Sequence, residues 1–213
     1  MTGSFTTFIV DDDPSILKAL SRILQGAGYN ARPYSSPSTF LREHDPAVAG
    51  CAIIDVSMPE LNGLELQEKL AQQGADRQVI FLTGNGCIPM SVQAMRAGAI
   101  DFLTKPIERG ALLSAVSRAR DRDESIRQVR ETIKVINERM LRLTPREREV
   151  MSHVVMGRLN KQIASDLGTV EKTIKVHRSR MMAKLGVRSV AELVRMTERL
   201  TTAQERLKKV DPA

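Results

Sequence analysis

The chain has 213 residues, of which 42% are hydrophobic, so it can form one large domain or two modest ones with cores of ordinary size. Tryptophan is absent and aromatic residues make up only 3%, which argues against recognition of single-stranded nucleic acid by base stacking. No apolar stretch is long enough to span a bilayer, and no signal-peptide pattern opens the chain. We therefore expect a soluble, cytoplasmic protein without a membrane partner.

The net charge of +7 comes from the last third of the chain. Residues 1–120 carry 11 Lys and Arg against 12 Asp and Glu, and residues 121–143 carry 6 against 5. Residues 144–213 carry 15 against 8. Such an excess in one segment is typical of a nucleic-acid-binding domain beside a near-neutral one, although a basic surface kept for solubility would give the same balance.

The first 120 residues alternate strand and helix signals five times. We expect strands near 5–10, 28–33, 50–55, 78–83 and 99–104, and helices near 14–26, 36–44, 62–73, 88–97 and 107–120. This alternation predicts an α/β domain with a doubly wound, five-stranded parallel sheet and right-handed crossovers. The pair Asn62-Gly63 is expected to mark a loop at the end of a strand.

Polar side chains stand where four of these strands end. Asp11 and Asp12 follow the first strand, Asp55 ends the third, Thr83 ends the fourth and Lys105 follows the fifth. In an open α/β sheet these ends converge on one crevice. Three carboxylates there would repel one another, and Mg2+, which prefers oxygen ligands, would neutralise them. A lysine and a hydroxyl suit phosphoryl oxygens, so the pattern predicts transfer of a phosphoryl group onto one aspartate.

The two cysteines have no metal-ligand spacing and suggest no disulfide framework. Cys51 is expected in the core of the third strand. Cys87 is expected in a loop beside the acidic crevice, where the sequence gives little support for a redox or metal role.

Residues 121–143 carry apolar side chains at spacings of three and four, which predicts a helix between two domains. They are Ile126, Val129, Ile133, Ile136, Met140 and Leu143. Such a stripe could form a short parallel coiled coil that pairs two chains, or it could pack onto one of the chain's own domains. The sequence leaves both open.

Residues 144–213 show helix signals only and predict a four-helix, all-α domain. Thr144-Pro145-Arg146-Glu147 is a capping-box start for the first helix. A second helix is expected near 160–167, a third near 171–185 and a fourth from 191 onward. In the third helix one stripe should pack inward, namely Ile174, His177, Met181 and Leu185. The opposite stripe should face outward, namely Lys172, Lys175, Val176 and Ser179.

An outward polar stripe is what a recognition helix in the major groove needs. Lys175 can reach guanine, Val176 can touch a thymine methyl group, and Ser179 can bond several base edges. Other side chains are better placed for phosphate contacts, which position the protein without reading sequence: Asn160, Lys161, Thr173, Arg178, Arg180 and Lys184.

The segments IVDDDPSILKAL, AIIDVSMPELNGLEL, VIFLTGNG and AGAIDFLTKP resemble the receiver domain of two-component response regulators over residues 5–120. The resemblance implies a flavodoxin-like fold with Asp55 as the phosphoacceptor and Mg2+ as the cofactor. Asp12 and Asp55 would supply metal carboxylates, Asp11 would hold a metal-bound water, and the Ser57 carbonyl would complete the protein ligands.

The same resemblance implies a switch. Lys105 would pair with the phosphoryl oxygens, the Thr83 hydroxyl would move to meet them, and the ring of Phe102 would turn inward. The Lys105–Pro106 peptide bond would be cis. Asn85 and Cys87 stand where close relatives tend to carry His and Asp, which leaves the lifetime of the phosphorylated form open.

The segment LTPREREVMSHVVMGRLNKQIASDLGTVEKTIKVHRSRMMAKLGVRS resembles a LuxR-type helix-turn-helix over about residues 140–200. With the receiver, it resembles the FixJ subfamily, of the FixJ/NarL type. The implied organisation is a receiver at 1–120, a helical linker at 121–143 and a DNA-binding domain at 144–213, with the helix-turn-helix at about 160–179.

The implied protein is a transcription factor rather than an enzyme, whose receiver catalyses only its own phosphorylation and dephosphorylation. A histidine kinase would phosphorylate Asp55, which promotes homodimerisation and binding to double-stranded DNA, and RNA polymerase would be a further partner. Three alternatives remain: a DNA-binding regulator that acts without phosphorylation, a Mg2+-dependent phosphohydrolase with an aspartyl-phosphate, and a receiver that signals through protein contacts alone. The phosphohydrolase is disfavoured because residues 144–213 supply no cap domain.

Overall fold

The computed structural model describes residues 5–74, 77–84, 94–95 and 98–210, with side chains described as far as residue 208. Contacts divide the chain into two units, Met1–Ser125 and Ile126–Ala213, and each is described by itself. Within the described residues, no helix combines the length and the apolar character of a membrane-spanning segment. Of the expected helix near 88–97, only residues 94 and 95 are described, and both are helical, while Asn85 and Cys87 lie outside the described residues.

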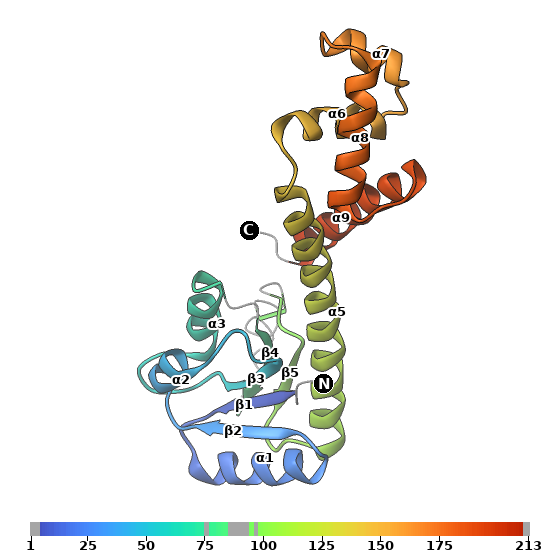
Figure 1. Ribbon diagram of the computed structural model, residues 1–213. Helices are drawn as coiled ribbons and strands as arrows, with labels where there is room; N and C mark the ends of the chain where they lie inside the picture. Colours follow the sequence, from blue (N-terminus) through green and yellow to red (C-terminus); the bar gives the residue numbers. More distant parts are fainter. Residues whose placement is uncertain (1–4, 75–76, 85–93, 96–97, 211–213) are drawn as a thin grey trace. The chain divides into compact units, whose positions relative to one another are not determined.

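The first unit is built on a parallel sheet with the strand order β2-β1-β3-β4-β5 (Figure 1). Its strands are β1 (Thr6–Val10), β2 (Asn30–Tyr34), β3 (Gly50–Asp55), β4 (Gln78–Thr83) and β5 (Asp101–Thr104). All residues of β1, β3 and β4 are buried, because helices cover both faces of the sheet. The predicted five-stranded, doubly wound parallel fold is thereby confirmed.

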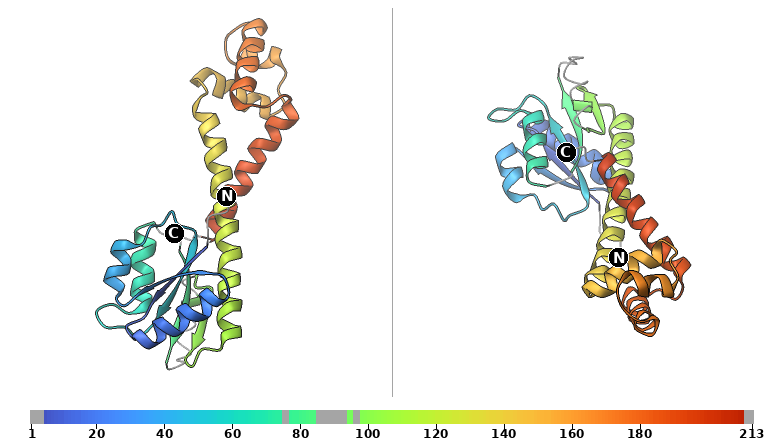
Figure 2. Two further views of the ribbon diagram at one scale, coloured as in Figure 1. Left: turned by 60° about the horizontal axis from the view of Figure 1, so that its bottom comes forward. Right: turned by 90° about the horizontal axis from the view of Figure 1, so that it is seen from above.

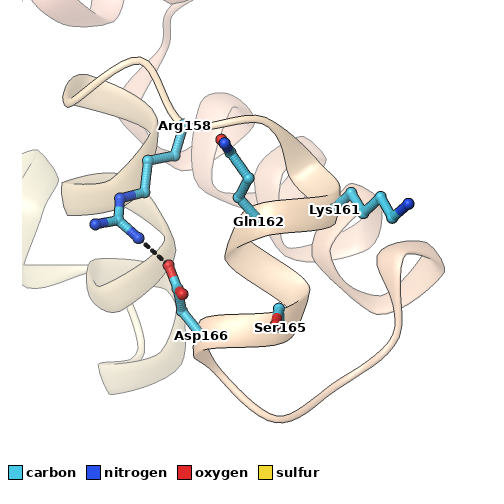
Figure 3. A pocket seen from close by; sticks show the side chains of 5 residues that line it. All are labelled: Arg158, Lys161, Gln162, Ser165 and Asp166. Atoms are coloured by element: carbon cyan, nitrogen blue, oxygen red, sulfur yellow. Dashed lines mark hydrogen bonds and ion pairs between the residues drawn. The ribbon is translucent and has the colours of Figure 1, made fainter.

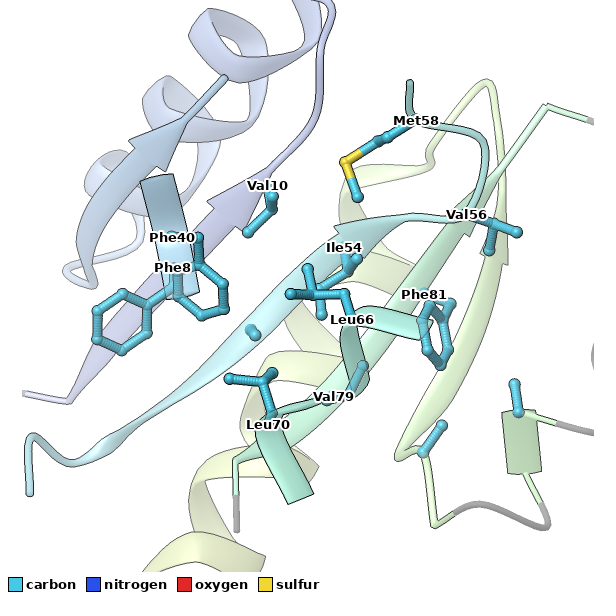
Figure 4. Close-up of a cluster of buried hydrophobic side chains, with 13 residues drawn as sticks. Phe8, Val10, Phe40, Ile54, Val56, Met58, Leu66, Leu70, Val79 and Phe81 are labelled. Atoms are coloured by element: carbon cyan, nitrogen blue, oxygen red, sulfur yellow. The ribbon is translucent and has the colours of Figure 1, made fainter. Parts of the chain in front are cut away.

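Two hydrophobic clusters fill the space between the sheet and its helices. One lies beneath α2 (Pro37–Glu43) and α3 (Gly63–Gln72), and Figure 4 shows Phe40 and Leu66 of these helices against Phe8, Ile54 and Phe81 of the sheet. The other lies on the opposite face, beneath α1 (Pro14–Gly26) and the first turns of α5 (Arg109–Leu141), helices that Figures 1 and 2 show on this face. Cys51 belongs to this second cluster, as predicted, and burial raises the pKa of its thiol to about 12.

The helices begin where capping residues stand. Asp13 caps α1 by accepting a hydrogen bond from Ser15 N–H (2.8 Å), and Pro14 follows it as the first helical residue. Asn62 caps α3 in a reciprocal capping box with Glu65. Asn62-Gly63, which the sequence indicates as a loop signal, is therefore also the start of the helix expected near 62–73.

Helix α5 (Arg109–Leu141) is a single helix of 33 residues, drawn without a break in Figure 2. The sequence pattern predicts one helix that ends at 120 and a separate helical linker at 121–143, whereas α5 runs through both segments. The charged composition changes there, but residues 111–141 contain neither Gly nor Pro, so nothing in the chain terminates the helix.

The second unit holds the last turns of α5 with α6 (Pro145–Val155), α7 (Asn160–Asp166), α8 (Glu171–Leu185) and α9 (Val190–Val210). Thr144 and Glu147 form the predicted capping box at the start of α6. One core runs through all five helices and includes Ile136, Met140 and Leu143. The second half of the apolar stripe at 121–143 therefore packs onto the chain's own C-terminal helices.

Candidate functional site

The polar residues predicted to converge at the strand ends do so. Asp11 follows β1, Asp55 ends β3, Thr83 ends β4 and Lys105 follows β5, so all four lie at the carboxyl edge of one parallel sheet. A backbone hydrogen bond from Lys105 N–H to the Thr83 carbonyl (2.7 Å) continues the sheet past its last paired residues and fixes the start of the loop that carries the lysine.

The ammonium group of Lys105 lies between the two aspartates. Its Nζ is 2.8 Å from Asp11 Oδ2 and 2.9 Å from Asp55 Oδ1. The Asp11 side chain is fully buried, the Asp55 side chain is 5% exposed, and the Lys105 side chain is 22% exposed, so the lysine reaches the acids from the rim. Asp55 Oδ2 also accepts a hydrogen bond from Ser57 N–H (3.0 Å).

Burial and charge shift the pKa values of two of these groups. Burial raises the pKa of Asp11, against the hydrogen bonds from Lys105 and from Asp13 N–H (2.9 Å) that lower it. Burial alone would lower the pKa of Lys105, but its hydrogen bonds to Asp11 and Asp55 outweigh this and raise it. The lysine is therefore held as a cation beside carboxylates that gain from any added positive charge.

The donor set fits a divalent cation by charge and by ligand type. Asp11 and Asp55 present oxygen atoms that converge on one positive group, and Mg2+ prefers oxygen ligands. Asp12 is exposed directly beside Asp11, and Ser57 is exposed beyond Asp55. No group of three or more His, Cys, Asp or Glu side chains among the described residues is gathered into a preformed metal site.

The two predicted switch residues lie on neighbouring strands. The Thr83 side chain is buried at the end of β4, and Phe102 of β5 is partly buried. The Phe102 ring packs against the Phe81 ring with 6.3 Å between centroids. The Lys105–Pro106 peptide bond is cis, as the resemblance implied.

In the second unit, α8 presents the two faces expected of it. Ile174, Met181 and Leu185 are buried, and His177 is partly buried. The predicted outward stripe is exposed throughout, namely Lys172, Lys175, Val176 and Ser179. Among the predicted phosphate contacts, Lys161 and Arg180 are exposed, and Asn160, Thr173, Arg178 and Lys184 are partly buried.

Two of these partly buried residues make contacts that the sequence did not reveal. Lys184 Nζ lies 2.6 Å from Oε2 of Glu147, whose side chain is only 3% exposed, so the last turn of α8 is tied to the first turn of α6. Arg178 donates to Oδ1 of Asn160 (2.5 Å), which ties α8 to the start of α7. Both pairs are separated by many residues, so only the packing of the helices brings them together.

Lys161 lines an open pocket of about 650 Å³ on the outer side of α7. Figure 3 shows its other lining residues, Arg158, Gln162, Ser165 and Asp166, with the Arg158 guanidinium paired to the Asp166 carboxylate.

Comparison with known proteins identifies both units. The response regulator receiver domain family matches residues 7–117, and the luxR family of bacterial regulatory proteins matches residues 141–197. The chain belongs to the response regulators. This response regulator carries a receiver domain and a LuxR-type DNA-binding domain, and the combination is that of a transcription regulator. A receiver implies a histidine kinase partner, and a LuxR-type domain implies binding to DNA.

Relatives share this organisation over nearly their whole length. The response regulator protein TmoT of Ectopseudomonas mendocina is 44% identical over 91% of this chain and 88% of that protein. The transcriptional regulatory protein FixJ of Rhizobium meliloti is 36% identical over 90% of this chain and 94% of that protein. Among solved structures, the response regulator StyR is 42% identical, covers 92% of this chain and 99% of its own, and superposes with a TM-score of 0.87.

Proposed function

We propose that Asp55 is the phosphoacceptor of this response regulator. The observation that carries the proposal is the position of the Lys105 ammonium between Asp11 and Asp55. An oxygen of the Asp55 carboxylate would attack the phosphorus atom in line, and the bond from phosphorus to the donor's leaving group would break. Lys105 would offset the charge on the phosphoryl oxygens, so the chain contributes position and charge rather than a general base.

The residues that would hold Mg2+ are Asp11, Asp12, Asp55 and the carbonyl of Ser57. Bound there, the cation would supply positive charge for the phosphoryl oxygens. Support comes from the fully buried Asp11 carboxylate, whose burial raises its pKa and whose ionised form gains from added positive charge. The receiver would catalyse only its own phosphorylation and dephosphorylation.

The switch would run from the acidic edge to β5. Thr83 ends β4, and Phe102 packs on Phe81 one strand further along, so a shift of the Thr83 hydroxyl toward a phosphoryl group would free space for the Phe102 ring to turn inward. A repacking of this kind changes the surface around β5, and we infer that the changed surface favours a dimer. By linkage, a dimer that binds DNA more tightly is itself favoured by DNA.

The DNA contacts would come from the basic unit, through residues 144–213 and the helix-turn-helix at about 160–179. The exposed stripe of α8 would enter the major groove, where Lys175, Val176 and Ser179 would meet base edges. Phosphate contacts would come from Lys172 and from the flanking set, namely Asn160, Lys161, Thr173, Arg178, Arg180 and Lys184. RNA polymerase would be the further partner at a promoter.

The test couples the two halves of this proposal. A duplex is first selected from random DNA with the acetyl-phosphate-treated chain, and its affinity is then measured by anisotropy alongside the molar mass by light scattering. We expect Mg2+ with acetyl phosphate to raise both the affinity and the dimer fraction of the wild type, and to leave Asp55→Asn unchanged. Equal affinity with and without phosphorylation would instead support a regulator that acts independently of phosphate.

A further inference from the structure

The last turn of the recognition helix is held from two other helices. Lys184 pairs with the buried Glu147 carboxylate at the start of α6, and the Leu185 carbonyl accepts a hydrogen bond from Arg139 Nη1 (3.3 Å) in the last turn of α5. Two adjacent residues of α8 are thus fixed by charged groups from two separate elements, in a helix whose inner face already lies in the core.

Arg139 supplies a hydrogen-bond donor to the carbonyl groups that are left unpaired at the C-terminal end of a helix. The last carbonyl groups of a helix lack partners within it, and the helix dipole makes them attractive to a cation. Gly186, in the left-handed region with φ 69°, turns the chain away, and its N–H bonds back to Ala183 and Met182. The Leu185 carbonyl accepts its hydrogen bond from the guanidinium group of Arg139. Nη1 of Arg139 also lies 3.7 Å from the position that a Cβ atom on Gly186 would occupy.

Arg139 itself is placed by its neighbours on α5. Ile136 and Met140 belong to the same apolar core as Met181 and Leu185, so this stretch of α5 is part of the second unit's core, which also holds α8. The helix begins at Arg109 in the receiver and runs unbroken to Leu141. Arg139 lies in the part of α5 that belongs to the second unit, so the group that holds the end of α8 comes from the same unit as α8.

We propose that Arg139 is a positioning residue for DNA recognition, which sets the angle of α8 by holding its C-terminal end. The inference rests on the proposed function, in which the outward stripe of α8 reads base edges. Lys175 lies ten residues before Leu185 in one helix, a span of roughly 15 Å. A tilt of about 10° at the held end would move Lys175 by roughly 2.5 Å, more than a hydrogen bond to a base tolerates.

The test compares Arg139→Gln with Arg142→Gln, which removes the same charge from an exposed side chain three residues further on. Affinities are measured for the duplex selected by the wild type and for a scrambled duplex of the same composition, together with the thermal midpoint of each full-length variant. We expect Arg139→Gln to lose roughly tenfold on the selected duplex, the scale of one hydrogen bond to a charged group. On the scrambled duplex it should match Arg142→Gln. Arg139→Lys, which keeps the charge, should recover most of the lost affinity.

Three results would overturn the inference: equal losses on both duplexes, no greater loss than Arg142→Gln, or a loss that follows a lowered thermal midpoint and is not recovered by lysine. Failure of the proposed function would look different. In that case the wild type would select no duplex at all, or Lys175→Ala would bind the selected duplex as tightly as the wild type.

Discussion

A Cβ atom on Gly63 would lie 2.6 Å from the carbonyl oxygen of Asp55. Gly63 is the first residue of α3, and its N–H donates to the Val56 carbonyl (3.1 Å), so the helix starts directly against the strand end that carries the acid. Only a residue without a side chain allows this approach. The position of Asp55 therefore depends on a glycine that has no part in the chemistry.

Gly63→Ala should consequently lower the free energy of unfolding of the receiver by about 1–3 kcal/mol, the cost of forcing extra atoms into a packed site. It should also slow phosphorylation by acetyl phosphate. Gly110→Ala is the matched control, because that glycine also lies in the first turn of a helix and a Cβ there meets open space. Urea unfolding of both variants checks the prediction, which fails if the two are equally stable.

Asp11 should make the stability of the receiver fall as the pH rises. Its pKa is raised above 3.8 in the folded chain, so its contribution to stability is complete below pH 3.8 and is lost as the pH rises through the raised value. Asp11→Asn should remove this dependence and, without Mg2+ at neutral pH, raise the free energy of unfolding, because the folded chain no longer buries an ionised carboxylate there. Hydrogen exchange of β1 and β3 amides reports the receiver alone.

The same Asp11→Asn variant should be stabilised less by Mg2+ than the wild type, because binding to the folded state stabilises in proportion to affinity. A variant that is less stable than the wild type without Mg2+ would contradict the stability prediction for Asp11. A variant that gains as much stability from Mg2+ as the wild type would contradict the assignment of Asp11 to the metal site.

Glu147 should make the stability of the second unit fall as the pH falls, the opposite of the effect of Asp11. The hydrogen bond from Lys184, with that from Thr144 N–H, lowers the pKa of Glu147 below 4.5, so its contribution is present above pH 4.5 and is lost as the pH falls through the lowered value. Glu147→Gln should cost about 1–3 kcal/mol at pH 7 and progressively less below pH 4.5. Glu149→Gln, at an exposed ion pair with Arg146, should change stability by less than about 1 kcal/mol in urea unfolding.

Lys175 and Lys161 should separate base reading from phosphate contact. Lys175→Ala should weaken binding to the selected duplex by about 1–3 kcal/mol more than binding to a scrambled one, because a base contact discriminates between sequences. Lys161→Ala should weaken both equally and reduce the salt dependence of binding. Anisotropy titrations at several salt concentrations distinguish these patterns, and equal effects of the two substitutions would refute the assignment of α8 as the reading helix.

Local signals were enough to predict much of this molecule. Asp55 and Thr83 end their strands, and Asp11 and Lys105 directly follow theirs. Because the strands of a parallel sheet all point the same way, these four residues must lie at one edge of the sheet. The two faces of α8 followed in the same way from helical periodicity. Both inferences need only the geometry of a single element and the direction of its neighbours.

Contacts between elements were not predictable from such signals. Glu147 and Lys184 are 37 residues apart and pair because α6 and α8 pack together. In the sequence, Glu147 indicates only the capping box at the start of a helix. The requirement for Gly63 likewise depends on how closely α3 approaches β3. The absence of Gly and Pro from residues 111–141 predicts an unbroken α5, whereas the apolar spacing at 121–143 favours a separate linker helix.

The most direct test of the account is the intact mass of the chain after incubation with acetyl phosphate and Mg2+. Asp55→Asn is compared with Asp13→Asn, which changes an exposed acid near the same edge while keeping a side chain that can cap α1. We predict one phosphoryl adduct on the wild type and on Asp13→Asn, and none on Asp55→Asn or without Mg2+. An adduct that persists in Asp55→Asn, or its absence from the wild type, would contradict the assignment of Asp55 as the phosphoacceptor.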